Sequence, residues 1–223
     1  MRERIPKPAI ALAALLLLQG CLAGFGSGKS AETVAVTPSE IVIAGPRGYC
    51  IDTASLAEGR EGSFVLLASC AALSGAPDAP PPSIPGVLSA MVSADPDGTG
   101  FADALPGIEA FLVSGSGRAG LSRAGDAESV ALLQSRIAGD VLLLNLRDES
   151  AFNGPEIEPE YWRAVLAVRG HIVTLSAMVP AGQSGNGALA TLEAFIARVA
   201  QENAAPARDP VVGAISPRLR PTR

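Results

Sequence analysis

The clearest alternation of apolar and polar residues in this chain predicts a β-hairpin near its C-terminal end. Residues 161–169 and 171–179 are rich in apolar and β-branched residues, and Arg169-Gly170 forms the turn between them. If Val168 pairs with His171, apolar side chains meet across the strands on one face. The other pairs on that face are Leu166 with Val173, Ala164 with Leu175, and Trp162 with Ala177. A slip of one residue would turn the whole set to water, so the pattern predicts the register as well as the strands.

Shorter apolar runs predict further strands ahead of this hairpin. They lie at residues 40–44, 47–52, 63–70, 87–93, 130–136 and 141–147. Turn residues at 58–62 and 138–140 separate two pairs of these strands, as in antiparallel hairpins. The proline-rich residues 74–86 are predicted to form a loop, because proline lacks the N–H that a helix or a central strand requires.

Two segments have apolar residues at helical spacing and are predicted to form helices. The first begins at Leu105-Pro106, where proline is tolerated in a first turn, and it breaks near Gly115. Its apolar face comprises Ile108, Phe111 and Leu112. The second covers residues 187–201, with an apolar face of Leu189, Leu192, Ile196 and Val199. Because strands follow one another without alternating with helices, the predicted fold class is α+β, an antiparallel β-sheet with two main helices packed on it as an α/β sandwich.

The N-terminal segment carries a different pattern. Residues 9–18 are uninterruptedly apolar and follow a basic flank of Arg2, Arg4 and Lys7. This run falls well short of the roughly 20 residues that a membrane-spanning helix needs, and it matches the length of a secretory signal core. We therefore divide the chain into four parts. These are a signal peptide at 1–20, a flexible tether at 21–36, a single α+β domain at 37–202 and a disordered, Pro- and Arg-rich tail at 203–223.

The end of the apolar run, Leu18-Gln19-Gly20-Cys21, resembles the lipobox of bacterial lipoproteins. The resemblance implies that the signal is cut before Cys21, that the Cys21 thiol is diacylated, and that the new amine receives a third acyl chain. Leu22 in place of Asp implies sorting to the outer membrane, by analogy with the same family. The whole chain is also similar to small envelope lipoproteins of alphaproteobacteria, with residues 45–52 as the closest feature. That likeness implies no particular activity.

A second resemblance concerns the fold. Residues 161–173 place an aromatic–Arg strand, a Gly turn and a β-branched strand ahead of the helix at 187–201. This order resembles the PsbP-like fold. The resemblance implies an α/β/α sandwich and no site residues.

Composition and cysteine content agree with export. Cleavage before Cys21 removes three basic residues and one acidic residue, which leaves 14 Lys+Arg against 21 Asp+Glu. An acidic domain lacks the basic footprint that nucleic acid requires, so nucleic acid is excluded as a partner. Cys50 and Cys70 form an even pair on either side of a predicted turn. In an oxidising compartment this pair is predicted to form a disulfide.

A phosphate-binding loop is the first alternative interpretation. Residues 23–30, Ala-Gly-Phe-Gly-Ser-Gly-Lys-Ser, fit its relaxed pattern, with Lys29 in the phosphate-binding position of a P-loop-type ATPase. Such a loop needs a helix after Ser30, whose N-terminus faces the phosphates. The residues that follow are β-branched and end at Pro38, which disfavours a helix.

Three further features suggest chemistry less strongly. His171 is the only histidine and would be the base of a periplasmic hydrolase, but no Gly-x-Ser-x-Gly segment supplies a nucleophile. Asp95, Asp97 and Asp103 partly match a calcium loop, which lacks its closing Glu. A Gly-x-Gly-x-x-Gly sequence at 115–120 follows a helix, whereas the dinucleotide fingerprint follows a strand.

The sequence thus predicts a membrane-anchored periplasmic lipoprotein that is not an enzyme and requires no cofactor. Its expected role is to bind a partner or to support envelope structure. The expected partners are the membrane, through acylated Cys21, and an envelope protein or an anionic envelope polymer, which the basic tail at 203–223 could contact.

Overall fold

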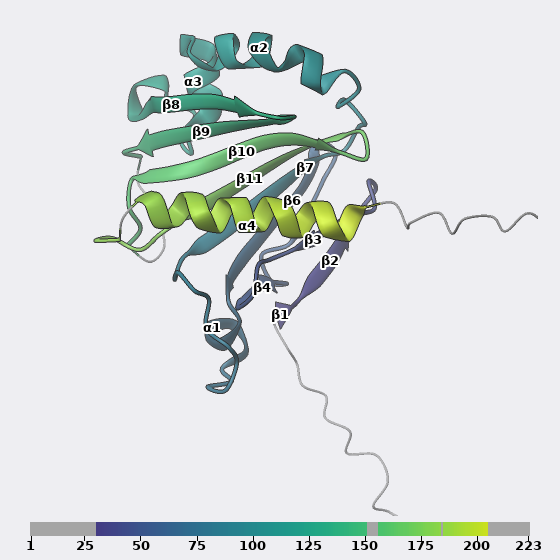
Figure 1. Cartoon of the computed structure of the whole chain (residues 1–223), viewed down its shortest axis with the longest axis vertical. Helices are drawn as coiled ribbons and strands as arrows, with labels where there is room; N and C mark the ends of the chain where they lie inside the picture. Colours follow the sequence, from purple (N-terminus) through teal and green to yellow (C-terminus); the bar gives the residue numbers. More distant parts are fainter. Residues whose placement is uncertain (1–29, 151–155, 184, 205–223) are drawn as a thin grey trace, which may run out of the picture.

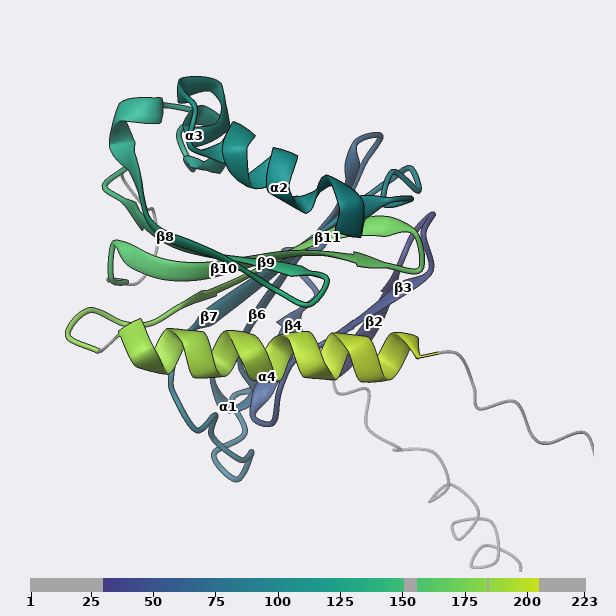
Figure 2. The ribbon, with the colours of Figure 1, turned by 45° about the horizontal axis from the view of Figure 1, so that its top comes forward.

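A computed structural model describes residues 30–150, 156–183 and 185–204, and these residues confirm the α+β prediction (Figure 1). A large antiparallel sheet of nine strands forms the centre of the described chain. Helices pack on both of its faces, as the turned view in Figure 2 shows. None of the described helices is long and apolar enough to cross a membrane.

The strands of the large sheet agree closely with the alternation in the sequence. They are β1 (Ser30–Ala31), β4 (Tyr49–Asp52), β5 (Ala57–Glu58), β6 (Gly62–Ser69), β7 (Val87–Ser93), β8 (Val130–Ala138), β9 (Val141–Asp148), β10 (Glu160–Val168) and β11 (His171–Met178). Their spatial order is β1-β4-β6-β7-β11-β10-β9-β8, with β5 paired to β6. The predicted register of the last hairpin is confirmed, because Val168 lies opposite His171 and Trp162 opposite Ala177.

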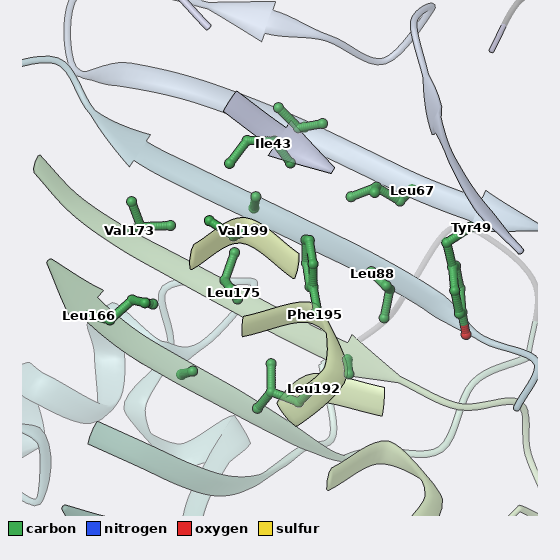
Figure 3. Packing of buried hydrophobic residues seen from close by; sticks show 14 of the residues in the cluster. Ile43, Tyr49, Leu67, Leu88, Leu166, Val173, Leu175, Leu192, Phe195 and Val199 are labelled. Atoms are coloured by element: carbon green, nitrogen blue, oxygen red, sulfur yellow. The ribbon is translucent and has the colours of Figure 1, made fainter. Parts of the chain in front are cut away.

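One face of the sheet is covered by α4 (Gly185–Asn203) together with a two-stranded ribbon of β2 (Thr33–Val36) and β3 (Ile41–Ala44). Leu192, Phe195 and Val199 of α4 point at the sheet in Figure 3 and are fully buried. They pack with Leu88, Leu166 and Leu175 in one hydrophobic core. Burial of each large side chain contributes about 1.5–3 kcal/mol, so this layer supplies much of the stabilisation.

The opposite face is only partly covered. Two helices, α2 (Phe101–Leu112) and α3 (Gly115–Leu121), and a 3-10 turn at Ala127–Ser129 lie over the end of the sheet formed by β8, β9 and β10. Phe101, Leu105 and Leu121 from this layer form a second core with residues of β9. Phe64 of β6 and Met91 of β7 remain 37% and 58% exposed on the same face. A short helix, α1 (Cys70–Ser74), follows β6 at the far end of the sheet.

The first predicted helix has a different beginning and a different face. It starts at Phe101, so Pro106 lies inside α2 and not in its first turn. Burial of Phe101 and Leu105 in the second core extends the helix towards the N-terminus. Phe111, which we expected on the apolar face, is 55% exposed.

Both predicted domain boundaries are displaced. Residues 30–36, assigned to the tether, form β1 and β2, and Val36 is fully buried. At the other end Asn203, assigned to the tail, closes α4 and bonds to β3: its side-chain amide donates to the Val42 carbonyl and accepts from the Val42 N–H. The pairing of β1 with β4 and the bonds of Asn203 to Val42 join residues distant in sequence, so local composition did not reveal them.

The predicted disulfide between Cys50 and Cys70 is present. The two cysteines are not directly opposite each other in the strand pairing: Cys50 lies opposite Ala68, and Cys70 opens α1. The turn between the cysteine strands is confirmed: the N–H of Gly59 and the N–H of Gly62 each donate to the other's carbonyl.

Candidate functional site

The phosphate-loop alternative lacks the helix that it requires. Cys21 and residues 23–29 lie outside the described residues, so lipidation and most of that loop stay predictions. Ser30, the last residue of the loop pattern, begins β1, and β2 follows at residues 33–36. A strand at this position offers no helix N-terminus to a phosphate.

His171 lies at the start of β11 and is held by the backbone. Its Nδ1 is 3.0 Å from the carbonyl oxygen of Ser93. A carbonyl only accepts, so Nδ1 carries the proton. The Ser93 hydroxyl instead donates to the Asp95 carbonyl and accepts from the Ile172 N–H. This arrangement positions a turn and does not join the imidazole to a nucleophile.

The other two candidate stretches also have structural explanations. Asp95 and Asp97 lie in a turn whose Gly98 N–H donates to the Gly170 carbonyl, while Asp103 is in the first turn of α2. Within the described ranges no group of three or more His, Cys, Asp or Glu residues is placed to hold a metal ion. The glycine-rich residues 115–121 are α3 itself, and Gly117 packs closely on the Phe111 carbonyl.

A groove on the partly covered sheet face brings together a different set of residues. The antiparallel registers align two rows of side chains across four neighbouring strands, β10, β11, β7 and β6. The Met91 row comprises Val165, Thr174, Met91 and Phe64. The Arg163 row comprises Arg163, Ser176, Ser89 and Leu66. These rows form the floor of the groove, and Ile108 and Leu112 of α2 with Leu121 of α3 form its wall.

The size of the groove suits a small molecule. Its main part has a volume of about 580 Å³, and an inner part beside Tyr161 and Met178 has about 180 Å³. Small-molecule sites in proteins commonly measure about 300–1,000 Å³. Ser89 and Ser176 lie in the middle of the Arg163 row. Their side chains are smaller than those of Arg163 and Leu66 at the ends of the row, so the floor is lowest there.

Arg163 is fixed at the centre of the groove. Its Nε donates to Ser176 Oγ at 3.1 Å, and its Nη1 donates to the Leu121 carbonyl at 3.3 Å. The guanidinium also lies 5.4 Å from the centre of the Tyr161 ring, within the range of a cation–π contact. No carboxylate of the described residues forms an ion pair with Arg163.

Arg123, the second arginine of the groove, has its charge compensated. Its Nε lies 3.1 Å from Oδ2 of Asp148, a fully buried carboxylate. Burial raises the pKa of Asp148, but hydrogen bonds from Ser150 and Arg123 and the charge of Arg123 outweigh it, so the pKa lies below its usual value. Asp148 therefore stays ionised at neutral pH and neutralises Arg123.

Tyr161 lines the inner part of the groove and carries a buried hydroxyl. The residue is 1% exposed, and its Oη has no hydrogen-bond partner in the described chain. Burial is the main cause that raises the pKa of Tyr161, and nearby Arg163 opposes it. The phenol therefore stays protonated at neutral pH and can donate a hydrogen bond.

Sequence reasoning missed this groove, although the signal was within reach. The predicted register of the 161–179 hairpin assigns Trp162, Ala164 and Leu166 to one face, and it assigns Tyr161, Arg163 and Val165 to the other. Only the apolar face of this hairpin entered the prediction. The sequence could not show that α2 and α3 leave the β6–β7 part of the second face uncovered.

Comparison with protein-family models, with curated proteins and with solved structures found no match. The function therefore has to be inferred from the residues and the geometry.

Proposed function

We propose that this protein is a lipid-anchored, extracytoplasmic binding module that holds its ligand in the groove between the sheet and α2–α3. The observation that carries the proposal is the difference between the two sheet faces. One face is closed by α4 over a continuous core, whereas the other leaves Phe64 and Met91 open beside a fixed arginine. Exposed apolar area next to a few converging polar groups is typical of ligand sites.

Binding, rather than catalysis, agrees with the chemistry of the lining. The described residues that line the groove include hydroxyls, two arginines and apolar side chains, but no His, Cys or carboxylate. General acid–base or nucleophilic catalysis most often uses one of those groups within hydrogen-bond reach of the substrate. The lining supplies groups that orient a ligand and lacks the usual group that would activate one.

The location outside the cytoplasm is supported by two independent features. The Leu18–Cys21 motif follows an apolar run of signal length, and the Cys50–Cys70 disulfide suits an oxidising compartment. The anchor is tested by metabolic labelling with palmitate and by fractionation of wild type and Cys21→Ala. We expect a processed, labelled, membrane-bound wild type and a larger, unlabelled variant. Equal size and equal fractionation of the two would refute the anchor.

The ligand site is tested by photo-crosslinking in the native envelope. A photoactivatable residue replaces Met91 in the groove or, as a matched control, Leu133, an exposed apolar residue of β8 outside the groove lining. We expect irradiation to give an adduct of defined mass at position 91 and none at position 133. Absence of an adduct at position 91, or equal adducts at both positions, contradicts binding in the groove.

A further inference from the structure

We infer that the groove binds a single-chain amphiphile with a carboxylate head. The head lies against Arg163 and Tyr161, and the acyl chain follows the Met91 row beneath α2. This inference rests on the proposed function, because it names the ligand class of the same groove. Its support comes from charge, from the polar and apolar parts of the lining, and from strand pairing.

The charge of the lining favours a monoanion. Among the described residues that line the groove are two arginines and no carboxylate, and buried Asp148 compensates only Arg123. One positive charge, that of Arg163, is therefore left to be matched by a ligand. A carboxylate supplies one negative charge, whereas a phosphate monoester carries about −1.5 to −2 at neutral pH.

The polar groups are held ready for a head group. Two hydrogen bonds fix the Arg163 guanidinium and use only part of its N–H groups, so others remain for a carboxylate. The inner part of the groove combines Arg163 with Ser89, Ser176 and Tyr161, whose buried hydroxyl has no partner among the described residues. A planar carboxylate suits the planar guanidinium, and fixed donors lower the ordering cost of binding.

The apolar part accepts a flexible chain. Met91 and Phe64 on the floor and Ile108 and Leu112 on the wall line the outer groove, with Met91 more than half exposed. Methionine adapts its shape and suits a ligand without a fixed outline. The volume of about 580 Å³ leaves room for one chain. A bilayer patch would instead need a broad convex surface, which a groove beside α2 does not offer.

Strand pairing argues against an extended peptide as the occupant. β6, β7, β11 and β10, which form the floor, are each paired on both sides within the sheet. Most of their backbone N–H and C=O groups are therefore used, and strand addition needs an open edge. The floor of the groove therefore offers mainly side chains, which suits a ligand with one polar end.

The test titrates the full chain with dodecanoate below its critical micelle concentration. The chain is held in phosphatidylcholine nanodiscs, with empty nanodiscs as the blank, and binding is measured by calorimetry. We expect one saturable site, weakened at least about ten-fold by Arg163→Gln, since charge-assisted hydrogen bonds are lost. Arg136→Gln, on β8 and paired with Glu193 of α4, is the matched control and should bind as wild type does.

A second pair of variants covers the case in which Arg163→Gln fails to fold, as shown by its thermal midpoint. Met91→Glu places a negative charge beside the chain at an exposed position and should abolish binding, whereas Met91→Gln should retain most of it. Wild-type affinity in Arg163→Gln or Met91→Glu overturns the inference. So does dodecanol binding as tightly as dodecanoate, because the head would then contribute nothing, or dodecyl phosphate binding more tightly.

The two proposals fail in different ways. If position 91 captures a ligand in the envelope but dodecanoate does not bind, the carboxylate assignment is wrong and the binding module stands. A peptide adduct at position 91 likewise overturns the carboxylate assignment and leaves the binding module in place. If position 91 captures nothing and dodecanoate does not bind, the groove is not a binding site.

Discussion

The two arginines of the groove differ in what surrounds them. Arg123 is joined to Asp148 by an ion pair, by its own backbone N–H and by a bond from Nη2 to the Asp148 carbonyl. Arg163 bonds to a hydroxyl and a carbonyl, which carry no charge. We therefore assign Arg123 to the architecture of the groove and Arg163 to its ligand.

Replacement of Asp148 by Asn tests the architectural role. The change leaves Arg123 without its buried counter-charge, and we expect a loss of about 3 kcal/mol in the free energy of unfolding. Denaturant unfolding at pH 7 measures it. Asp78→Asn, at an exposed carboxylate in the proline-rich loop, is the control and should change stability by less than about 0.5 kcal/mol.

We also expect Asp148→Asn to change how the stability depends on pH. Because the pKa of folded Asp148 lies below its unfolded value of about 3.9, its contribution is complete above that value. It is lost as the pH falls through the lower folded pKa. Wild type should therefore lose stability more steeply than Asp148→Asn below about pH 4. Parallel curves for the two proteins would show that Asp148 is not the group responsible.

Two buried tyrosines give a second prediction at this scale. Tyr49 Oη donates to the Ile84 carbonyl at 2.7 Å, whereas Tyr161 Oη has no partner among the described residues. Tyr49→Phe should cost about 1 kcal/mol, and Tyr161→Phe should be nearly neutral in the empty protein. Thermal and denaturant unfolding compare them. A larger loss for Tyr161→Phe would mean that its hydroxyl is already satisfied.

Tyr49 should also govern alkaline stability. Burial raises its pKa to about 12, so folded protein keeps the proton that unfolded chain releases near pH 10. The contribution is complete below about pH 10 and is lost as the pH rises towards 12. Tyr49→Phe should flatten this part of the stability curve, as measured by denaturant unfolding from pH 9 to about 11.

At the scale of elements, the sequence predicted those features that depend on residues close together along the chain. The β10–β11 hairpin was predicted with its register because one face alternates without interruption and Arg169-Gly170 supplies the positive φ angles of the turn. The start of α2 was not predicted correctly. Its first apolar residues are recognised only from the second core, in which they are buried. The groove was missed for the same reason, since its outline depends on how far α2 and α3 extend over the sheet.

Asn203 tests the corrected boundary of the folded unit. Its side chain bonds to both the N–H and the carbonyl of Val42 and so joins the end of α4 to β3. Asn203→Ala should reduce stability by about 1–2 kcal/mol, because two backbone groups lose partners. Gln201→Ala, at an exposed position in the same turn, should cost far less. Equal stability of the two variants would place the boundary before Asn203, as the sequence had suggested.

At the scale of the whole molecule, the two faces of the sheet differ in how completely they are covered. The α4 face carries a continuous core from β3 to β10 and accounts for most of the burial. The second core is smaller and lies towards β8 and β9, so the β6–β7 end of that face stays partly exposed, where we propose that the ligand binds. A rigid sheet with one closed face suits a module that presents a preformed groove from a membrane anchor.

Through the disulfide, the stability of the fold should depend on the compartment in which the chain folds. The bridge joins residues 20 apart, and closing such a loop contributes about 3 kcal/mol in the chain-entropy estimate. Chain produced in the cytoplasm without residues 1–21 should therefore keep the thiols of Cys50 and Cys70 reduced and unfold at a lower temperature than exported chain. The Cys50→Ala/Cys70→Ala double variant should show one midpoint from either source. Thiol titration of denatured protein and calorimetry check this. An exported protein with two free thiols would contradict both the bridge and the proposed location.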